Sequence, residues 1–251
     1  MTTTTIDQAA AQLAGHQGFS IISNETLRQL YISMVKSRLL EARLGASTGR
    51  EAAAVGVLAG VLAEDAVTAA HSDFVVRFLK NELQGNPLAE LLNRSAEPDF
   101  AGQLKLALQT AQANQKAKKS TISAVFSESD SGFSEKLLKQ AGAKRLPILF
   151  VRHTNLLSEI PEGKATIIPV IPVDGRDVVA IYRVATESIT HARKGNGPTL
   201  IECVFDPTEA LDPIQKMEAY LTRKGLFSEE WKRKEADGFA RSLDGAVPVK
   251  V

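Results

Sequence analysis

The sequence has too few cysteines for covalent cross-linking. Its 251 residues include a single cysteine, Cys203, which excludes an intrachain disulfide and a metal site built from cysteines. This scarcity fits a reducing compartment. Cys203 lies in the apolar run PTLIECVFDP, and this context predicts a buried and unreactive thiol.

The sequence also lacks an excess of charge and a long apolar run. Thirty basic residues face 29 acidic ones, and a net charge of +1 gives no basis for electrostatic binding of nucleic acid. The longest apolar stretch, residues 52–63, is too short to span a bilayer. The N-terminus has no charged region followed by an apolar one, so a secretory signal is not expected. We therefore expect a cytoplasmic protein with neither nucleic acid nor membrane as a partner.

The first part of the chain has helical periodicity. Residues 1–22 are expected to form a poorly ordered lead-in, and residues 23–251 a single domain. Asn24 is predicted to cap a long amphipathic helix. The small residues of segment 52–63, with Gly56 and Gly60, predict a helix that others approach closely. That helix could lie between subunits, within the core of the chain, or both.

From residue 120 onward, short β-branched runs alternate with helical segments. Buried strands are predicted in four runs: STISAVF, LPILFVR, ATIIPVIPVDG and PTLIECVF. A short strand that enters a turn is predicted before them, in AVTAAHSDF. Helices of ten or more residues separate the later strands. The predicted fold class is α/β, with a mostly parallel sheet and helices on both faces.

Parallel sheets bind ligands at the carboxyl ends of their strands. Three short segments follow predicted strands: SES at 127–129, HTN at 153–155, and AHSDF at 70–74. We therefore expect the functional site to contain residues from these three segments.

Two longer segments carry a resemblance to a known family. GREAAAVG at 49–56 is similar to a G-Q-E-A-x-x-V-G motif, and the more specific match is IPVDGRDVVAIYRVATESITHARKGNGPTLIEC. The latter resembles V-D-G-x-D-V-x-A-V followed by G-x-G-P-x-L-I-E. Over most of its length the chain resembles the alpha subunit of the thiamine-diphosphate-dependent first component of 2-oxo acid dehydrogenase complexes, of the pyruvate and branched-chain types.

The resemblance implies a thiamine-diphosphate-binding fold and a specific cofactor site. In that family the diphosphate lies against a Gly-Asp-Gly turn, whose glycines let backbone amides approach the anion. The aspartate and a downstream asparagine hold Mg²⁺, and a Tyr-Arg-x-His cluster binds the phosphates. A histidine on a later loop faces the substrate, and a beta subunit holds the aminopyrimidine half.

This sequence departs from the family at the metal-binding positions. Ser127, Glu128 and Ser129 stand where the family has Gly-Asp-Gly. Thr154 and Asn155 replace an asparagine pair of which the first is the ligand. A glutamate is one methylene longer than an aspartate, and Mg²⁺ requires octahedral ligands at about 2.0–2.1 Å. Glu128 and Asn155 are therefore degenerate cofactor-binding positions, and no bound metal or cofactor is expected.

The phosphate-binding and substrate-facing positions differ as well. His71, Ser72 and Phe74 replace the tyrosine, arginine and histidine of the phosphate cluster, so His71 is a third degenerate cofactor-binding position. The glycine-rich substrate loop is missing before AGQLKLAL, and the loop with the catalytic histidine is shortened to DPTEAL. The resemblance is thus to a truncated and degenerate member, in which no catalytic residue can be named.

His153 permits two readings. It could bind a softer metal than Mg²⁺ together with Glu128 and Asn155. The alternative, which we favour, is a hydrogen-bonded histidine at the end of a strand.

Three functions fit these observations. The first is a non-catalytic structural or regulatory subunit, working as a homodimer or with a beta-type subunit. The second is an active 2-oxo acid dehydrogenase alpha subunit that works with a beta subunit in oxidative decarboxylation. The third is a small-molecule binder that reuses the emptied crevice.

Overall fold

The computed structural model describes seven stretches of the chain: 22–45, 49–70, 72–93, 99–127, 133–155, 168–205 and 211–246. The predicted lead-in lies outside the described residues, except for Ile22. In these stretches no helix is long and apolar enough to cross a bilayer.

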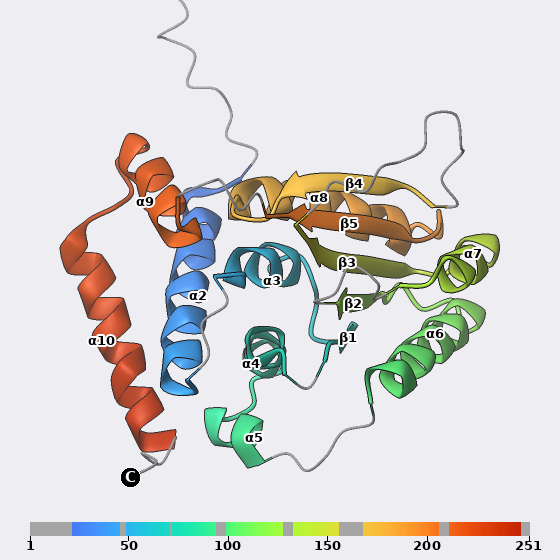
Figure 1. Ribbon diagram of the computed structural model, residues 1–251, viewed down its shortest axis with the longest axis horizontal. Coiled ribbons are helices and arrows are strands. Elements are labelled where there is room, and N and C mark those ends of the chain that lie inside the picture. Colours follow the sequence, from blue (N-terminus) through green and yellow to red (C-terminus); the bar gives the residue numbers. More distant parts are fainter. Residues whose placement is uncertain are drawn as a thin grey trace, which may run out of the picture.

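Five parallel strands form one sheet (Figure 1). They are β1 (Ala66–Thr68), β2 (Ser123–Ser127), β3 (Ile148–Thr154), β4 (Val170–Asp174) and β5 (Thr199–Val204), in the spatial order β1-β2-β3-β5-β4. Every neighbouring pair is parallel, which confirms the predicted sheet. Pro172 lies in β4, an edge strand, where a residue without an N–H is tolerated.

Alternate strand residues point into two separate hydrophobic cores, as the pleat of a strand requires. Ala124, Leu149 and Ile201 point into the larger core, and Val125 and Phe150 into the smaller one. The larger core includes residues of α2 (Asn24–Arg43), α3 (Glu51–Leu58), α4 (Phe74–Leu83) and α8 (Val178–Arg193); the smaller one includes residues of α6 (Phe100–Lys116) and α7 (Glu135–Ala143). The prediction of helices on both faces is therefore confirmed.

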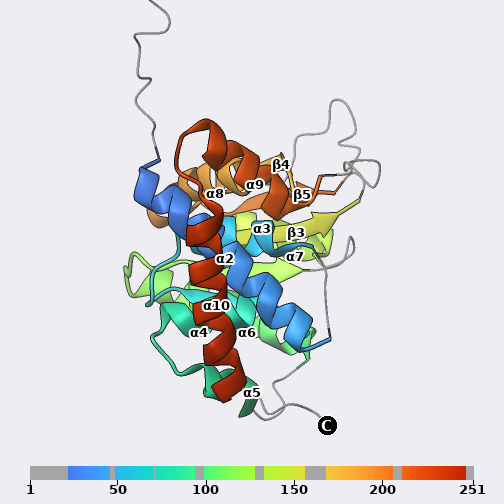
Figure 2. The same cartoon turned by 90° about the vertical axis from the view of Figure 1, so that its left-hand side faces the viewer.

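The remaining helices are α5 (Leu88–Asn93), α9 (Pro213–Arg223) and α10 (Glu229–Ala246), and the last of these lies alongside α2 in both ribbon views (Figures 1 and 2). Tyr31 of α2 holds the last two helices, α9 and α10, against α2. Its side chain is fully buried, its ring contacts Phe227 and Trp231, and its hydroxyl donates to Glu218 at 2.8 Å. Burial raises the pKa of Tyr31 far above its ordinary value, so the hydroxyl stays a donor.

Local capping chemistry sets two of the helix starts. The residue that caps α2 is Ser23 rather than the predicted Asn24, because the helix begins at Asn24 and the Ser23 hydroxyl accepts from the Thr26 amide at 3.0 Å. At α4 the cap is Asp73, whose carboxylate accepts from the Val76 amide at 2.9 Å. In both cases the side chain satisfies an amide that has no partner within its helix.

The small residues of α3 bring α8 close to it. All eight residues of α3 are buried. A Cβ added to Gly56 would lie 2.7 Å from Cγ2 of Ile181 and 3.0 Å from the Val178 carbonyl oxygen. This helix was predicted to lie between subunits, within the core of the chain, or both, and the structure shows it within the core of the chain.

Gly56→Ala tests this close approach. Overpacking costs about 1–3 kcal/mol, and the better helix propensity of alanine returns about 0.5–1 kcal/mol. We expect a net loss of up to about 2.5 kcal/mol in the free energy of unfolding, measured by urea denaturation.

Gly238→Ala is the matched control, because Gly238 lies inside α10 and an added Cβ meets nothing within 4 Å. It should gain about 0.5–1 kcal/mol. Equal effects of the two substitutions would contradict the α3–α8 contact.

Candidate functional site

The carboxyl ends of β3, β4 and β5 lie together, as their shared direction requires, and face α2 and α9 (Figure 1). Of the three predicted cofactor-binding residues, Glu128 and His71 lie outside the described residues. Asn155 follows β3 directly and is exposed. The grouping of these three side chains into one site stays a prediction.

His153 is the penultimate residue of β3 and points toward the larger core. Its side chain is 6% exposed, and its ring centroid lies 5.5 Å from that of Phe205 in an edge-to-face arrangement. Neither ring nitrogen has a hydrogen-bond partner in the described part of the chain, so the predicted hydrogen bond of this histidine is not found there. Burial, with a smaller effect from the charge of Arg50, lowers the pKa of His153 to about 4. The imidazole is therefore neutral near pH 7.

Phe205 covers the ends of the neighbouring strands. The residue follows β5, and a Cβ added to Gly175 would come within 2.4 Å of its ring, so the ring lies directly against the turn after β4. The guanidinium groups of Arg50 and Arg176 lie 5.7 and 5.6 Å from the ring centroid. Phe205 was not predicted as a site residue, because only the register of β4 against β5 brings it close to Gly175.

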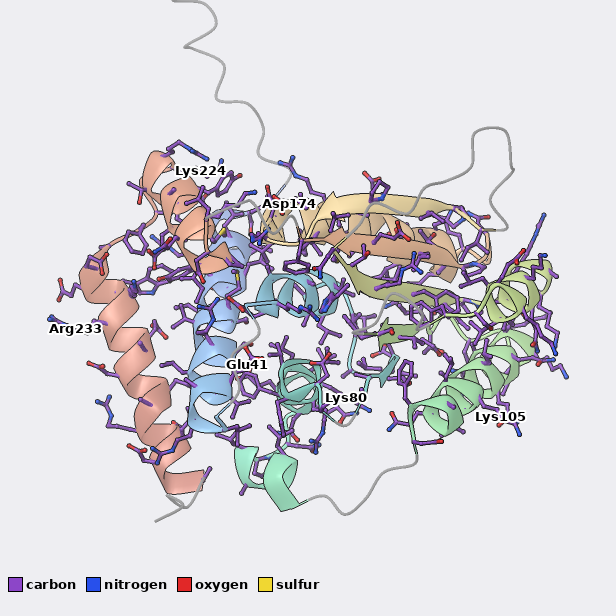
Figure 3. The ribbon with its side chains drawn as sticks, in the orientation of Figure 1. Glu41, Lys80, Lys105, Asp174, Lys224 and Arg233 are labelled. Carbon is purple, nitrogen blue, oxygen red and sulfur yellow. The ribbon has the colours of Figure 1, made fainter. Side chains whose placement is uncertain are left out.

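Several charged side chains described at this end of the sheet are paired. Lys216 of α9 forms an ion pair with Asp174 at the tip of β4, a residue labelled in Figure 3. Arg38 of α2 contacts both Glu51 and Asp212, the latter at 2.9 Å. Burial raises the pKa of Glu51, whose side chain is fully enclosed, although the positive charge of Arg38 opposes the shift. These pairs tie α2, α3 and α9 to the sheet.

The described residues include one part of the predicted magnesium–diphosphate position, the end of β3. Thr154, at the position of the metal-binding asparagine of the family, is buried, and its carbonyl oxygen accepts from the Phe205 amide at 2.8 Å. Mg²⁺ requires several oxygen ligands in octahedral geometry, which a neutral imidazole beside an aromatic ring does not supply. Among the described residues no group of three or more His, Cys, Asp or Glu could hold a metal. A softer-metal site with Glu128 stays a prediction, because Glu128 lies outside the described residues.

A cavity lies away from the strand ends. It has a volume of about 460 Å³ and opens between α2, α3, α4 and α8, where Leu30, Leu58, Leu79 and Tyr182 line it. None of the strand-end residues borders it, so its size does not indicate a site at the predicted position.

The low pKa of His153 makes the stability of the fold depend on pH. Between pH 6.5 and about 4 the unfolded chain binds a proton that the folded chain does not, so the free energy of unfolding falls as pH falls through this window. The full loss is about 3 kcal/mol for a shift of this size. Urea denaturation at pH 7, 5.5 and 4 measures it.

His153→Leu should remove this contribution and keep the stability at pH 7, because an apolar group replaces two nitrogens without partners. His191→Leu, on the half-buried side of α8, is the control for losing a histidine and should keep the parent profile. An unchanged profile in His153→Leu would contradict the assignment.

Comparisons with known proteins match this chain to one family over part of its length. The family described as "Dehydrogenase E1 component" matches residues 152–205, which run from the end of β3 through β4 and α8 to Phe205. A solved structure from Mycobacterium smegmatis, assigned as thiamin diphosphate-dependent, matches 62% of this chain and 32% of its own, with a TM-score of 0.41 and 14% identity.

Curated relatives give the same indication. The chloroplastic pyruvate dehydrogenase E1 component subunit alpha-3 of Arabidopsis thaliana is 35% identical over 37% of this chain and 29% of its own length. The subunit alpha of 3-methyl-2-oxobutanoate dehydrogenase from Mycobacterium tuberculosis is 40% identical over 24% and 22%. The pyruvate dehydrogenase E1 component subunit alpha of Staphylococcus aureus is 26% identical over 68% and 56%. Thus the chain spans at most about half the length of these relatives. It is related by sequence to the alpha subunits of 2-oxo acid dehydrogenase E1 components, as the motifs around Asp174 and Gly197 predicted.

Proposed function

We propose that this chain is a non-catalytic structural or regulatory subunit, derived from the alpha subunits to which it is related. The observation that supports this most strongly is the aromatic packing at the strand ends. The ring of Phe205 lies against Gly175 and beside His153, where an α/β sheet normally presents polar groups to a ligand.

The chemistry of the neighbouring residues supports the same proposal. A buried imidazole with a pKa of about 4 is a poor proton acceptor near neutral pH, where a general base works best with a pKa close to the ambient pH. Thr154 offers a hydroxyl where the family has a carboxamide ligand, and Ser127 and Ser129 add side chains where glycines let amides approach a phosphate. We infer that the site no longer retains thiamine diphosphate and Mg²⁺.

The relatives suggest how such a chain is used. Each is named as an alpha subunit, that is, as one part of an assembly. We propose that this chain likewise works in an assembly, either as a homodimer or with a beta-type subunit. A cytoplasmic location and a single domain from residue 23 onward remain predictions.

A second candidate is an active 2-oxo acid dehydrogenase alpha subunit. It is favoured by the relatives that are named dehydrogenases. It would need Glu128 and Asn155 to hold Mg²⁺ in spite of Thr154, with a beta subunit supplying the rest of the site.

A thermal shift with thiamine diphosphate separates the two candidates. A ligand bound only by the folded state raises the melting temperature. We expect the same melting temperature with thiamine diphosphate plus Mg²⁺ as with thiamine diphosphate plus EDTA. The Mg²⁺-dependent difference is the quantity to measure, because binding of the diphosphate elsewhere on the surface does not require the metal.

The measurement is repeated with a beta subunit of a related enzyme present. A clear Mg²⁺-dependent rise in either arm would replace the first candidate by the second. Light scattering tests the assembly: we expect twice the chain mass of 27.1 kDa, or a complex with the beta subunit. A monomer that ignores the beta subunit would contradict this part of the proposal.

A further inference from the structure

The sheet has two edges, and an edge strand carries backbone groups that could pair with a further strand. β1 lies at one edge and β4 at the other (Figure 1). In a parallel ladder, alternate residues of a strand bond to one neighbour, and the residues between them direct their N–H and C=O groups to the opposite side. At an edge this opposite side is a template for pairing with another chain. The way in which each edge is closed therefore decides which surfaces can meet a partner.

The hydrogen bonds of β4 show which of its residues face outward. The carbonyl oxygen of Pro169 accepts from a β5 amide at 2.9 Å, and the amide of Gly175 donates to a β5 carbonyl oxygen at 2.8 Å. Both residues therefore face β5, and by alternation the odd-numbered residues between them do so as well. The three residues that face outward are Val170, Pro172 and Asp174.

The middle one of these three positions is a proline. Pro172 is exposed and has no N–H, so a strand laid along this edge would have a carbonyl without its donor at the centre of the contact. At the end of the strand, the Asp174 carbonyl oxygen already accepts from the Asp177 amide at 3.1 Å, within the turn that follows. An edge of only five residues thus offers a partner strand an interrupted ladder.

The opposite edge is closed by a side chain. The Ala66 amide donates to the Ile122 carbonyl oxygen at 3.0 Å, so Val67, the middle residue of β1, faces away from β2. The Val67 carbonyl oxygen accepts from the ammonium of Lys80 on α4 at 2.9 Å. Figure 3 labels Lys80 between α4 and β1. Because Val67 is also buried, a further strand has no access to this edge.

We propose that Pro172 keeps the β4 edge from pairing with a second copy of this chain, so that a partner meets the chain outside its sheet. The two faces of the sheet are covered by helices, and the outward carbonyl of β1 is bonded to Lys80. The role of Pro172 stands on the register of β4 alone. The location of the partner surface rests, in addition, on the assembly proposed above.

Pro172→Thr restores an outward N–H without adding apolar surface. We expect copies of the full-length variant to pair through their β4 edges, so its apparent mass by light scattering should rise with concentration to at least twice that of the parent. Pro169→Thr is the matched control. Pro169 is also exposed, but an N–H at this position faces β5, so this variant should keep the parent mass at every concentration.

Hydrogen exchange separates edge pairing from unspecific aggregation. The outward amides of Val170 and Asp174 should become protected in associated Pro172→Thr and stay unprotected in Pro169→Thr. The parent mass for Pro172→Thr at all concentrations, an equal rise in both variants, or association without protection of these two amides would overturn the proposal. The mass of the parent chain tests the assembly, and the difference between the two variants tests the edge, so either can fail alone.

Discussion

The packing of Phe205 against the backbone of Gly175 decides what this end of the sheet can do. The ring occupies the space above the ends of β4 and β5, and its edge-to-face contact with His153 extends the apolar surface to β3. An imidazole kept from water without hydrogen bonds stays neutral well below its ordinary pKa. Because these contacts are made by strand-end residues, they fall where an α/β fold places its ligands.

The helices around this end depend on a second close contact. Gly56 lets α3 and α8 approach until an added methyl group would clash with Ile181. That approach brings the N-terminal ends of both helices, and with them Arg50 and Arg176, toward Phe205. The ion pairs from Arg38 to Glu51 and from Lys216 to Asp174 then fix α2 and α9 over the same end. These described charges thus serve to hold helices in place.

Much of this fold could be predicted from sequence. Short β-branched runs between helical segments indicated a parallel sheet with helices on both faces, because only a sheet buried on both sides has strands without polar alternation. Pro172 did not obscure β4, since that strand lies at an edge. The motifs around Gly175 and Gly197 predicted the family, and the region they occupy is the one that matches it.

The site was harder to predict, for physical reasons. The opposition of Gly175 and Phe205 depends on the register of β4 against β5, which the sequence does not specify. The burial of His153 without hydrogen-bond partners depends on side chains from elements that are remote in sequence, such as Phe205. The cap of α2 moved by one residue because both Ser23 and Asn24 can accept a hydrogen bond from a free amide, and only the geometry of the first turn selects between them.

The central claim is that His153 is buried against Phe205 at the strand ends. Proton NMR of the histidine ring signals measures this directly, with the His153 resonances assigned by their loss in His153→Leu. The account predicts a pKa of about 4 that thiamine diphosphate plus Mg²⁺ leaves unchanged. An ordinary pKa near 6.5, or a signal that moves when the cofactor and metal are added together, would contradict it.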